Sequence, residues 1–114
     1  MGQSMAAIML VIRNAQLKAY RDSLLLNVEA QALAEWPEVG RPAAEAVRQA
    51  IARALIYGLA SEQQLLRFLT VGRKLGVDFD LDPSHKWAQE ILNDAELAAA
   101  LKIGIVEDLA RQRE

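Results

Sequence analysis

Three aspartates at alternate positions, Asp78, Asp80 and Asp82, are the residues whose spacing comes nearest to a known chemistry. Carboxylates spaced in this way take positions one, three and five of a helix–loop–helix calcium site. Such a loop also needs a glycine at position six and a bidentate glutamate at position twelve, where this chain has Pro83 and Gln89. The sequence therefore does not predict a calcium site.

The same segment has a structural interpretation. Asp82 followed by Pro83 is typical of a helix start, because the carboxylate accepts hydrogen bonds from free amides and proline has no amide hydrogen to satisfy. We expect Phe79 and Leu81 to anchor the segment inward and the first two aspartates to face water.

Residues that commonly carry catalysis are few in this chain. His85 is the single histidine, and its place beside the start of a short helix predicts a solvated surface residue. The serines, which are Ser4, Ser23, Ser61 and Ser84, have no glycine-flanked elbow of the kind that exposes a nucleophile. There is no cysteine, so thiol catalysis and cysteine-ligated metals are excluded. The sequence thus predicts no enzyme, no cofactor and no metal.

One pair of expected helices resembles a DNA-binding helix-turn-helix. Ala54 and, four residues later, Gly58 supply the small residue at the crossing and the glycine turn that a tight helix pair needs. The second helix, however, begins with Glu62, whose charge would approach phosphates. Gln64 and Arg67 are polar at positions where the motif requires apolar residues.

The charge of the chain is nearly balanced. It has 13 Lys and Arg against 15 Asp and Glu, for a net charge of −2. This balance argues against a protein dedicated to binding polyanions, and we expect no nucleic acid partner. A small helix-turn-helix regulator that uses helices at about residues 42–57 and 62–75 is kept as the alternative function.

Helices must position all of these residues. Of the 114 residues 53% are hydrophobic, and no window shows the sustained alternation of a strand. Apolar spacing, caps and prolines predict helices over about residues 15–36, 42–57 and 62–75, a short helix after Pro83 and a last helix capped by Asp94. Four to five short-linked amphipathic helices predict an all-α fold, a compact bundle.

Each expected helix has an apolar stripe that should face the core. In chain order the stripes are Leu17, Tyr20, Leu24, Val28 and Leu33; Val47, Ala50, Ile51, Ala54 and Leu55; Leu65, Leu66, Phe68, Leu69, Gly72 and Leu75; Trp87, Ala88, Ile91 and Leu92; and Leu97, Leu101, Ile105 and Leu109. We expect Leu69 to be buried between the second, third and last helices. Trp36 and Trp87, near helix ends, are expected to close the ends of the core.

The N-terminal residues 5–12 form an apolar run of eight. A membrane-spanning helix needs about 20 such residues, so we expect no membrane insertion and a cytoplasmic protein. The run is predicted to be a strand or an irregular tail that packs on the body, or else an extension before a start at Met5 or Met9, with Asn14 capping the first helix. The domains are therefore an apolar N-terminal extension, 1–13, and a single all-α domain, 14–112.

The same N-terminal third has more apolar residues than one packing stripe needs. Leu24, Leu25 and Leu26 are consecutive and cover more than half of the helix circumference. Leu25 is the residue expected to face outward, unless the N-terminal segment folds back over it. A protein-binding patch is predicted from the apolar residues Leu10, Ile12 and Leu25 and the charged rim residues Arg13, Lys18, Arg21 and Asp22.

Three segments of the chain, together with Phe68 and Trp87, are similar to segments of a known protein family. They are residues 9–16 (MLVIRNAQ), 57–62 (YGLASE) and 76–83 (GVDFDLDP). The chain resembles a family of small, largely uncharacterised all-helical bacterial proteins that are often encoded near type VI secretion genes and their toxic effectors. This resemblance implies an effector adaptor, a chaperone or an immunity protein, whose partner is a secreted toxin or a secretion component. It carries over no catalytic residues.

The leading functional prediction is therefore a non-enzymatic protein-binding module. Its partner is another protein, and a homodimer is the other arrangement that the apolar N-terminal third would suit.

Overall fold

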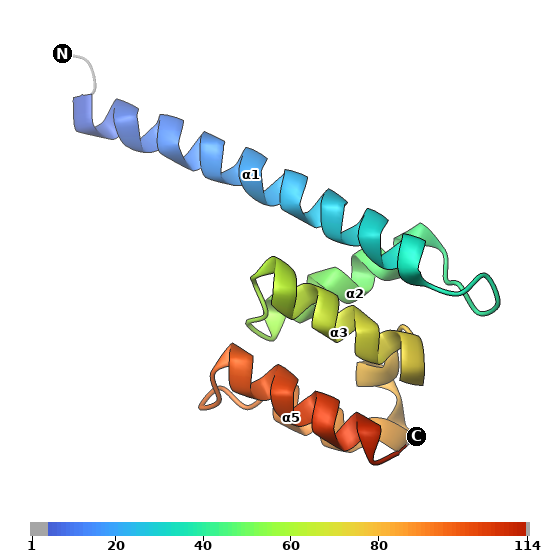
Figure 1. Ribbon diagram of the computed structural model, residues 1–114. Helices are drawn as coiled ribbons and strands as arrows, with labels where there is room; N and C mark the ends of the chain where they lie inside the picture. Colours follow the sequence, from blue (N-terminus) through green and yellow to red (C-terminus); the bar gives the residue numbers. More distant parts are fainter. Residues whose placement is uncertain (1–4, 114) are drawn as a thin grey trace.

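The computed structural model describes the backbone of residues 5–113 and the side chains from Lys18 to Arg113. Within this part of the chain the protein is all helical (Figure 1). The helices are α1 (Met5–Glu35), α2 (Ala44–Ile56), α3 (Glu62–Leu75), α4 (Lys86–Leu92) and α5 (Ala99–Arg111), with two single 3-10 turns, η1 (Phe79–Leu81) and η2 (Pro83–His85). The prediction of an all-α bundle is confirmed.

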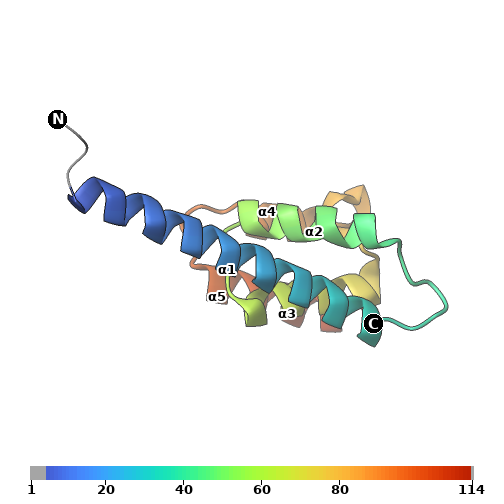
Figure 2. The same ribbon diagram turned by 90° about the horizontal axis from the view of Figure 1, so that it is seen from above.

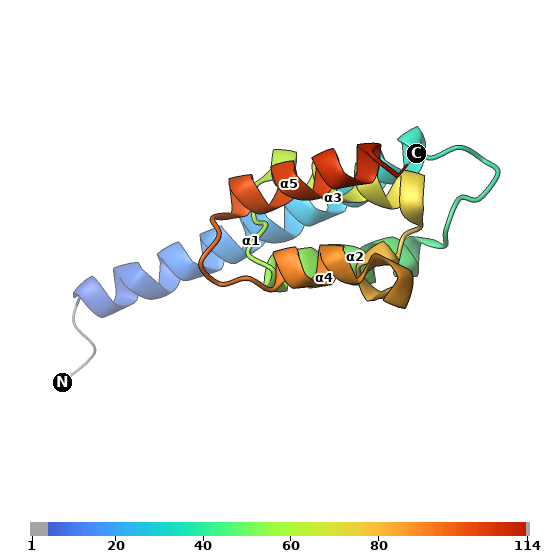
Figure 3. The same cartoon turned by 90° about the horizontal axis from the view of Figure 1, so that it is seen from below.

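The helices form three layers around α3. Figure 1 shows α1 on one side, α2 and α3 in the middle, and α5 on the side away from α1. Helix α3 contacts α1, α2 and α5, and α4 contacts α5 (Figure 3). Because α3 is the shared neighbour, its apolar face is the centre of the core. Its residues Leu65, Phe68 and Leu69 are buried, as the stripe predicted.

Local capping signals set the ends of α2 and α3 as expected. Gly58 takes a positive φ of 95° directly after α2, a conformation that favours glycine. Ser61 and Gln64 form the capping box, in which the Ser61 hydroxyl accepts from the Gln64 amide at 3.1 Å and the Gln64 side chain accepts from the Ser61 amide at 3.4 Å. Gly76 ends α3, again with a positive φ.

The first helix begins much earlier than the sequence predicted. Helix α1 starts at Met5 and runs unbroken to Glu35, so the prediction of a strand or irregular tail followed by a helix capped by Asn14 is wrong. No proline or glycine occurs between these residues, and asparagine inside a helix costs only a fraction of a kcal/mol, about 0.7 at most. The expected boundary between residues 13 and 14 therefore lies inside one helix.

The other end of α1 is held firmly. Arg41 donates two hydrogen bonds to the Trp36 carbonyl, at 2.7 and 3.2 Å, and Arg73 of α3 donates to the Glu35 carbonyl at 2.9 Å. Cations at these free carbonyls satisfy the C-terminal end of a helix. Trp36 itself is buried, which confirms the prediction that it belongs to the core.

Helix α1 is longer than the bundle on which it packs (Figure 2). Its 31 residues span about 46 Å, whereas the 13 and 14 residues of α2 and α3 span about 20 Å. The radius of gyration is 16.9 Å, against about 13 Å for a compact domain of this length. The C-terminal part of α1 belongs to the bundle, and its N-terminal part extends beyond the bundle.

This overhang explains why the predicted stripe of α1 is only half right. Val28 and Ala32 are buried and Leu25 packs against the core, but Tyr20 is 70% exposed. The position of Tyr20 follows helical spacing, yet its ring lies where α1 leaves the bundle and remains exposed beside a hollow that Leu55 of α2 also lines. Leu17 lies outside the described side chains.

The last helix is rotated and shortened relative to its prediction. Asp94 does not cap it; its carboxylate accepts from the Glu96 amide in the preceding turn, and the helix begins after Ala98. The residues turned to the core are Lys102, Ile103, Val106 and Ala110, while Leu101 is 52% exposed. The predicted leucines repeat every four residues, which drifts about 40° per step, so they cannot all remain on one face.

Replacing Leu69 with alanine tests the core. We expect the free energy of unfolding to fall by about 2–5 kcal/mol, because the side chain is buried in α3 and its removal leaves a cavity. Chemical denaturation of the wild type and the variant measures this loss.

The control is Leu101→Ala on the exposed face of α5, which should cost less than about 0.5 kcal/mol. Equal losses at the two positions would contradict the assignment of the core.

Candidate functional site

The most enclosed polar cluster lies where η1 meets α2. Asp80 is 1% exposed, and its carboxylate accepts from Arg53 Nε at 2.8 Å and from the Tyr57 hydroxyl at 2.7 Å. Arg53 Nη2 reaches the second Asp80 oxygen at 3.1 Å and also pairs with Asp78 at 3.0 Å. The prediction that Asp78 and Asp80 both face water is therefore wrong for Asp80. A buried carboxylate needs such partners, because its ionised form is costly to desolvate.

Of the two hydrophobic side chains beside Asp80, one is buried and the other is exposed. Phe79 is buried and stacks against Phe68 with ring centroids 5.1 Å apart, as expected, but Leu81 is 52% exposed. In the tight turn of η1, Phe79 and Asp80 point into the protein and Leu81 points out. The inward position that the sequence suggested for Leu81 is taken by a charged residue.

The ionisable groups of this cluster, Arg53, Tyr57, Asp78 and Asp80, are paired with one another, and we call the cluster the brace. Burial, followed by the hydrogen bond to Asp80, raises the pKa of Tyr57 well above its usual value. Burial opposes the charge of Arg53, but its bonds to Asp80 and Asp78 outweigh that effect and raise its pKa. Lys102 is also buried, and its Nζ donates to the Tyr57 carbonyl at 2.9 Å. Every polar side chain of the cluster thus has an internal partner, and the Asp80 carboxylate is closed to a ligand.

His85 is less solvated than the sequence suggested. Its ring is largely covered and lies 6.1 Å from the Trp87 ring, edge to face. Asp82 faces it at 3.9 Å from Nδ1 and, as predicted for a cap, accepts from the Ser84 amide at 2.9 Å. Trp87 packs partly against the core beneath Arg113, whose guanidinium carbon lies 4.4 Å from the ring centroid. No three acidic or histidine side chains among the described residues gather in a way that would hold a metal ion.

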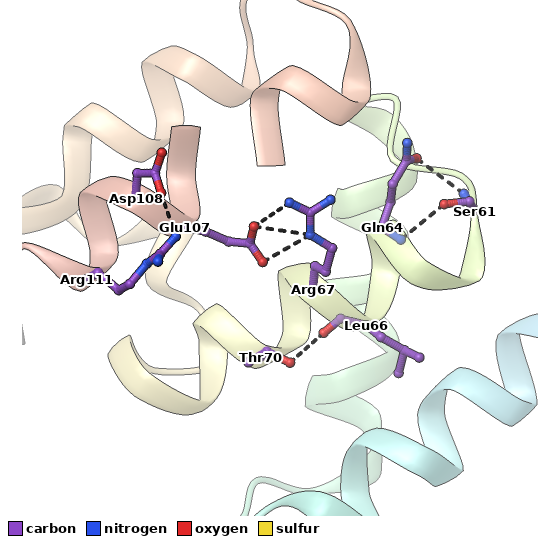
Figure 4. A network of polar contacts seen from close by, with 8 residues as sticks. All are labelled: Ser61, Gln64, Leu66, Arg67, Thr70, Glu107, Asp108 and Arg111. Carbon is purple, nitrogen blue, oxygen red and sulfur yellow. Dashed lines mark hydrogen bonds and ion pairs between the residues drawn. The ribbon is translucent and has the colours of Figure 1, made fainter. Parts of the chain in front are cut away.

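The polar residues of α3 make contacts within the protein (Figure 4). Arg67 Nε donates to both carboxylate oxygens of Glu107 on α5, at 3.1 and 3.0 Å, and this bond raises the pKa of Arg67 further. Gln64 is engaged in the capping box, and Thr70 donates to the Leu66 carbonyl. A recognition helix needs such side chains free for base edges, so this geometry does not favour the DNA-binding alternative.

An open depression lies between α1 and α2, and we call it the α1–α2 groove. Its volume is about 400 Å³, and it is lined by Asp22, Leu25, Leu26, Glu29, Arg48, Ile51, Ala52 and Leu55. The floor is apolar, and of the charged residues in the lining Asp22 and Arg48 are exposed and Glu29 is buried. Arg48 bridges the two helices at one end, with its Nε 3.0 and 3.1 Å from the two oxygens of the buried Glu29.

A second depression adjoins the groove, where α1 leaves the bundle. Its volume is about 490 Å³, and its lining is Lys18, Tyr20, Arg21, Leu24, Leu25, Leu55 and Ala60. Leu25 and Leu55 line both hollows and form the ridge between them. The two hollows together follow α1 for several turns, which fits an elongated occupant better than a small compact ligand.

The predicted protein-binding residues are partly brought together here. Lys18, Arg21 and Asp22 are exposed and border the two hollows. Leu25 does not face outward: it lies half-buried against the core, and Leu26 takes the outward position at 65% exposure. The N-terminal segment does not fold back over Leu25, because it continues α1 away from the bundle.

The remaining predicted residues, Leu10, Ile12 and Arg13, are on the helical backbone of α1, but their side chains lie outside the described residues. The α2 wall of the groove, with Ile51, Ala52 and Leu55, was not predicted. The signal for it was present in the sequence, because Ile51 and Leu55 belong to the apolar stripe of this helix.

Comparison with known proteins finds no family, no curated protein and no solved structure that matches this chain. Within the described part of the chain, no helix has the length and apolar character that crossing a membrane requires.

Replacing Asp80 with alanine tests the brace. We expect a loss of about 3 kcal/mol in the free energy of unfolding, because Arg53 and Tyr57 lose their shared buried partner. Asp78→Ala, two residues earlier and exposed, is the matched control and should change stability by less than about 0.5 kcal/mol. Denaturant titration of both variants measures the difference, and equal losses would refute the brace.

The raised pKa of Tyr57 predicts that the free energy of unfolding depends on pH in the alkaline range. Since its folded pKa is raised, its contribution to stability is fully present below about pH 10 and is lost as the pH rises toward the folded value, by up to about 1.4 kcal/mol per unit. In Tyr57→Phe we expect this part of the alkaline loss to disappear. Denaturation between about pH 9 and 11.5 measures it, with Tyr20→Phe at the exposed ring as control. Parallel pH curves for the wild type and Tyr57→Phe would show that Tyr57 does not contribute.

Proposed function

We propose that this protein is a non-enzymatic protein-binding module. The observation that carries the proposal is that α1 extends beyond the bundle and leaves an apolar groove beside its point of departure. We call residues 5–22 of α1 the α1 arm. The arm and the α1–α2 groove together form the proposed binding surface.

The physics of helix stability supports this proposal. Most of the stability of a helix in a protein comes from the packing of its apolar face rather than from intrinsic helix propensity. The arm contains the apolar run at residues 5–12, and eight residues exceed two helical turns, so such a run has no polar side. A partner that covers the arm would stabilise it and remove apolar surface from water.

The shape of the surface indicates how a partner binds. A helix laid in an apolar groove is a recurring mode of recognition, in which side chains three and four residues apart act as anchors. The exposed apolar residues Tyr20 and Leu26 stand on α1 beside the two hollows. Lys18, Arg21 and Asp22 lie at the rim, where charges set orientation and association rate more than affinity.

The resemblance to proteins encoded near type VI secretion genes narrows the proposal. Its first segment, residues 9–16, is part of the α1 arm, so one of the three segments that carry the resemblance belongs to the proposed binding surface. On this basis we propose an accessory role in the bacterial cytoplasm as an effector adaptor, chaperone or immunity protein. The partner would be a secreted toxin or a secretion component.

The binding surface is tested by Leu26→Glu. Because Leu26 is 65% exposed, we expect the free energy of unfolding to stay within about 0.5 kcal/mol of the wild-type value. Binding of the partner should be lost. Tagged wild type and variant are used to capture proteins from the native host, and the captured proteins are identified by mass spectrometry.

Leu101→Glu is the matched control, since Leu101 is also an exposed leucine but lies on α5, away from α1. A partner retained by the wild type and by this control, and lost with Leu26→Glu, supports the proposal. Identical captures by all three proteins would overturn it.

A further inference from the structure

The charges of α1 are separated along its length. Its basic residues, Arg13, Lys18 and Arg21, all precede its acidic residues, Asp22, Glu29 and Glu35. The helix therefore has a basic N-terminal half and an acidic C-terminal half, with the change of sign between Arg21 and Asp22.

This order is unfavourable for α1 by itself. The helix dipole favours acidic residues near the N-terminus and basic residues near the C-terminus, and α1 has neither in its terminal turns. The charges are instead complementary to another helix of the same kind in the opposite direction. Two parallel copies of α1 would place like charges together, whereas two antiparallel copies would place each basic half beside an acidic half.

We propose that the occupant of the α1–α2 groove is the α1 arm of a second copy of this chain, packed antiparallel in a two-fold dimer. This inference rests on the proposed function because it uses the same binding surface, and it places a second copy of the chain there instead of a toxin or a secretion component. The contact is isologous, so each copy both supplies an arm and offers a groove, and the assembly closes at two chains.

The lengths of the two parts of α1 fit this arrangement. The arm has about 18 residues, or about 27 Å, and the part of α1 that packs on the bundle is shorter, about 13 residues or 20 Å. One arm can therefore lie along the whole groove of the other copy. The two bundles would then lie at opposite ends of the helix pair.

The register follows from the row of residues on the groove side of α1. Lys18, Asp22, Leu25 and Glu29 are spaced by four, three and four residues, the spacing of a helix-packing seam. A two-fold axis near residue 20 places each Lys18 level with the second copy's Asp22. Residues 11–18 of the arm then lie along residues 22–29 of the groove.

Lys18 and Asp22 are available for this contact. Both side chains are exposed, and among the described residues neither makes an ion pair, in contrast to Glu29 and Glu35, which face arginines. Two cross-copy pairs at the centre of the seam would fix the antiparallel direction and the register.

Light scattering with size-exclusion chromatography, together with sedimentation, tests the dimer. We expect the wild type to be dimeric at micromolar concentration and Lys18→Glu or Asp22→Lys each to raise the dissociation constant about tenfold, because two ion pairs become two like-charge contacts. The double variant Lys18→Glu/Asp22→Lys should restore the dimer. Lys86→Glu, at an exposed lysine outside α1, is the control and should leave the dissociation constant unchanged.

Cysteine cross-linking tests the direction, because the chain has no cysteine of its own. A mixture of Lys18→Cys and Asp22→Cys chains should form a disulfide between the two kinds of chain. Neither variant alone should do so, since equal positions are displaced by about 6 Å along the helix axis, whereas residues 18 and 22 of the two copies are level. Linking of Lys18→Cys to itself would overturn the antiparallel arrangement. Circular dichroism of each variant checks that helix content is kept.

The outcomes separate this inference from the proposed function. A monomer at all concentrations overturns the dimer, while the proposed function stands if a different protein is still captured in a manner that depends on Leu26. A monomer with no such capture overturns both. Both the dimer and the proposed function are supported if the dimer dissociates with Leu26→Glu and with each single charge variant, and forms again with the double variant Lys18→Glu/Asp22→Lys.

Discussion

The buried carboxylate of Asp80 is the interaction on which the arrangement of the layers depends. Its oxygens accept from Arg53 and Tyr57 near the end of α2, and this bonding fixes η1 on the bundle. With η1 held there, Phe79 enters the core beside Phe68, and the chain is directed into α4 and α5. Lys102 of α5 returns to the same place through the Tyr57 carbonyl, so the outer layer is tied twice to the end of α2. A buried ionic group of this kind specifies one packing arrangement, because alternatives would leave it without partners.

The same layering explains the exposed surface on the opposite side. Helix α3 contacts α1 on one side and α5 on the other, and its length sets the length of the bundle. Helix α1 is anchored at its C-terminal end by Arg41 and Arg73 and is about twice as long as α3. Its N-terminal half consequently continues without a neighbour, and the α1–α2 groove opens where the support ends. The proposed binding surface is thus a geometric consequence of a long helix on a short bundle.

The sequence indicated which segment of the chain carries the candidate site, but not which face of α1 forms it. An excess of apolar residues around Leu24, Leu25 and Leu26 indicated a surface in the N-terminal third. Choosing among three consecutive leucines needs the rotation of α1 about its axis, which Val28 and Ala32 set by packing in the bundle. That rotation turns Leu25 toward the core and Leu26 outward. The apolar stripe of α2 was visible in the sequence, but which of its residues form the wall of the groove depends on which side of α2 faces α1.

The features that could be predicted from the sequence are those that short-range interactions control. The capping box of Ser61 and Gln64, the positive φ of Gly58 and Gly76 and the apolar face of α3 all involve residues within a few positions of one another. The burial of Asp80 and Lys102, the rotation of α1 and α5 and the extension of α1 beyond the bundle depend on contacts between residues far apart in the sequence. Asp80 is stable in the core because Arg53, 27 residues earlier, lies against it, and Lys102 is stable there because its ammonium donates a hydrogen bond to a carbonyl 45 residues earlier. Such pairs exist only once the layers are in place.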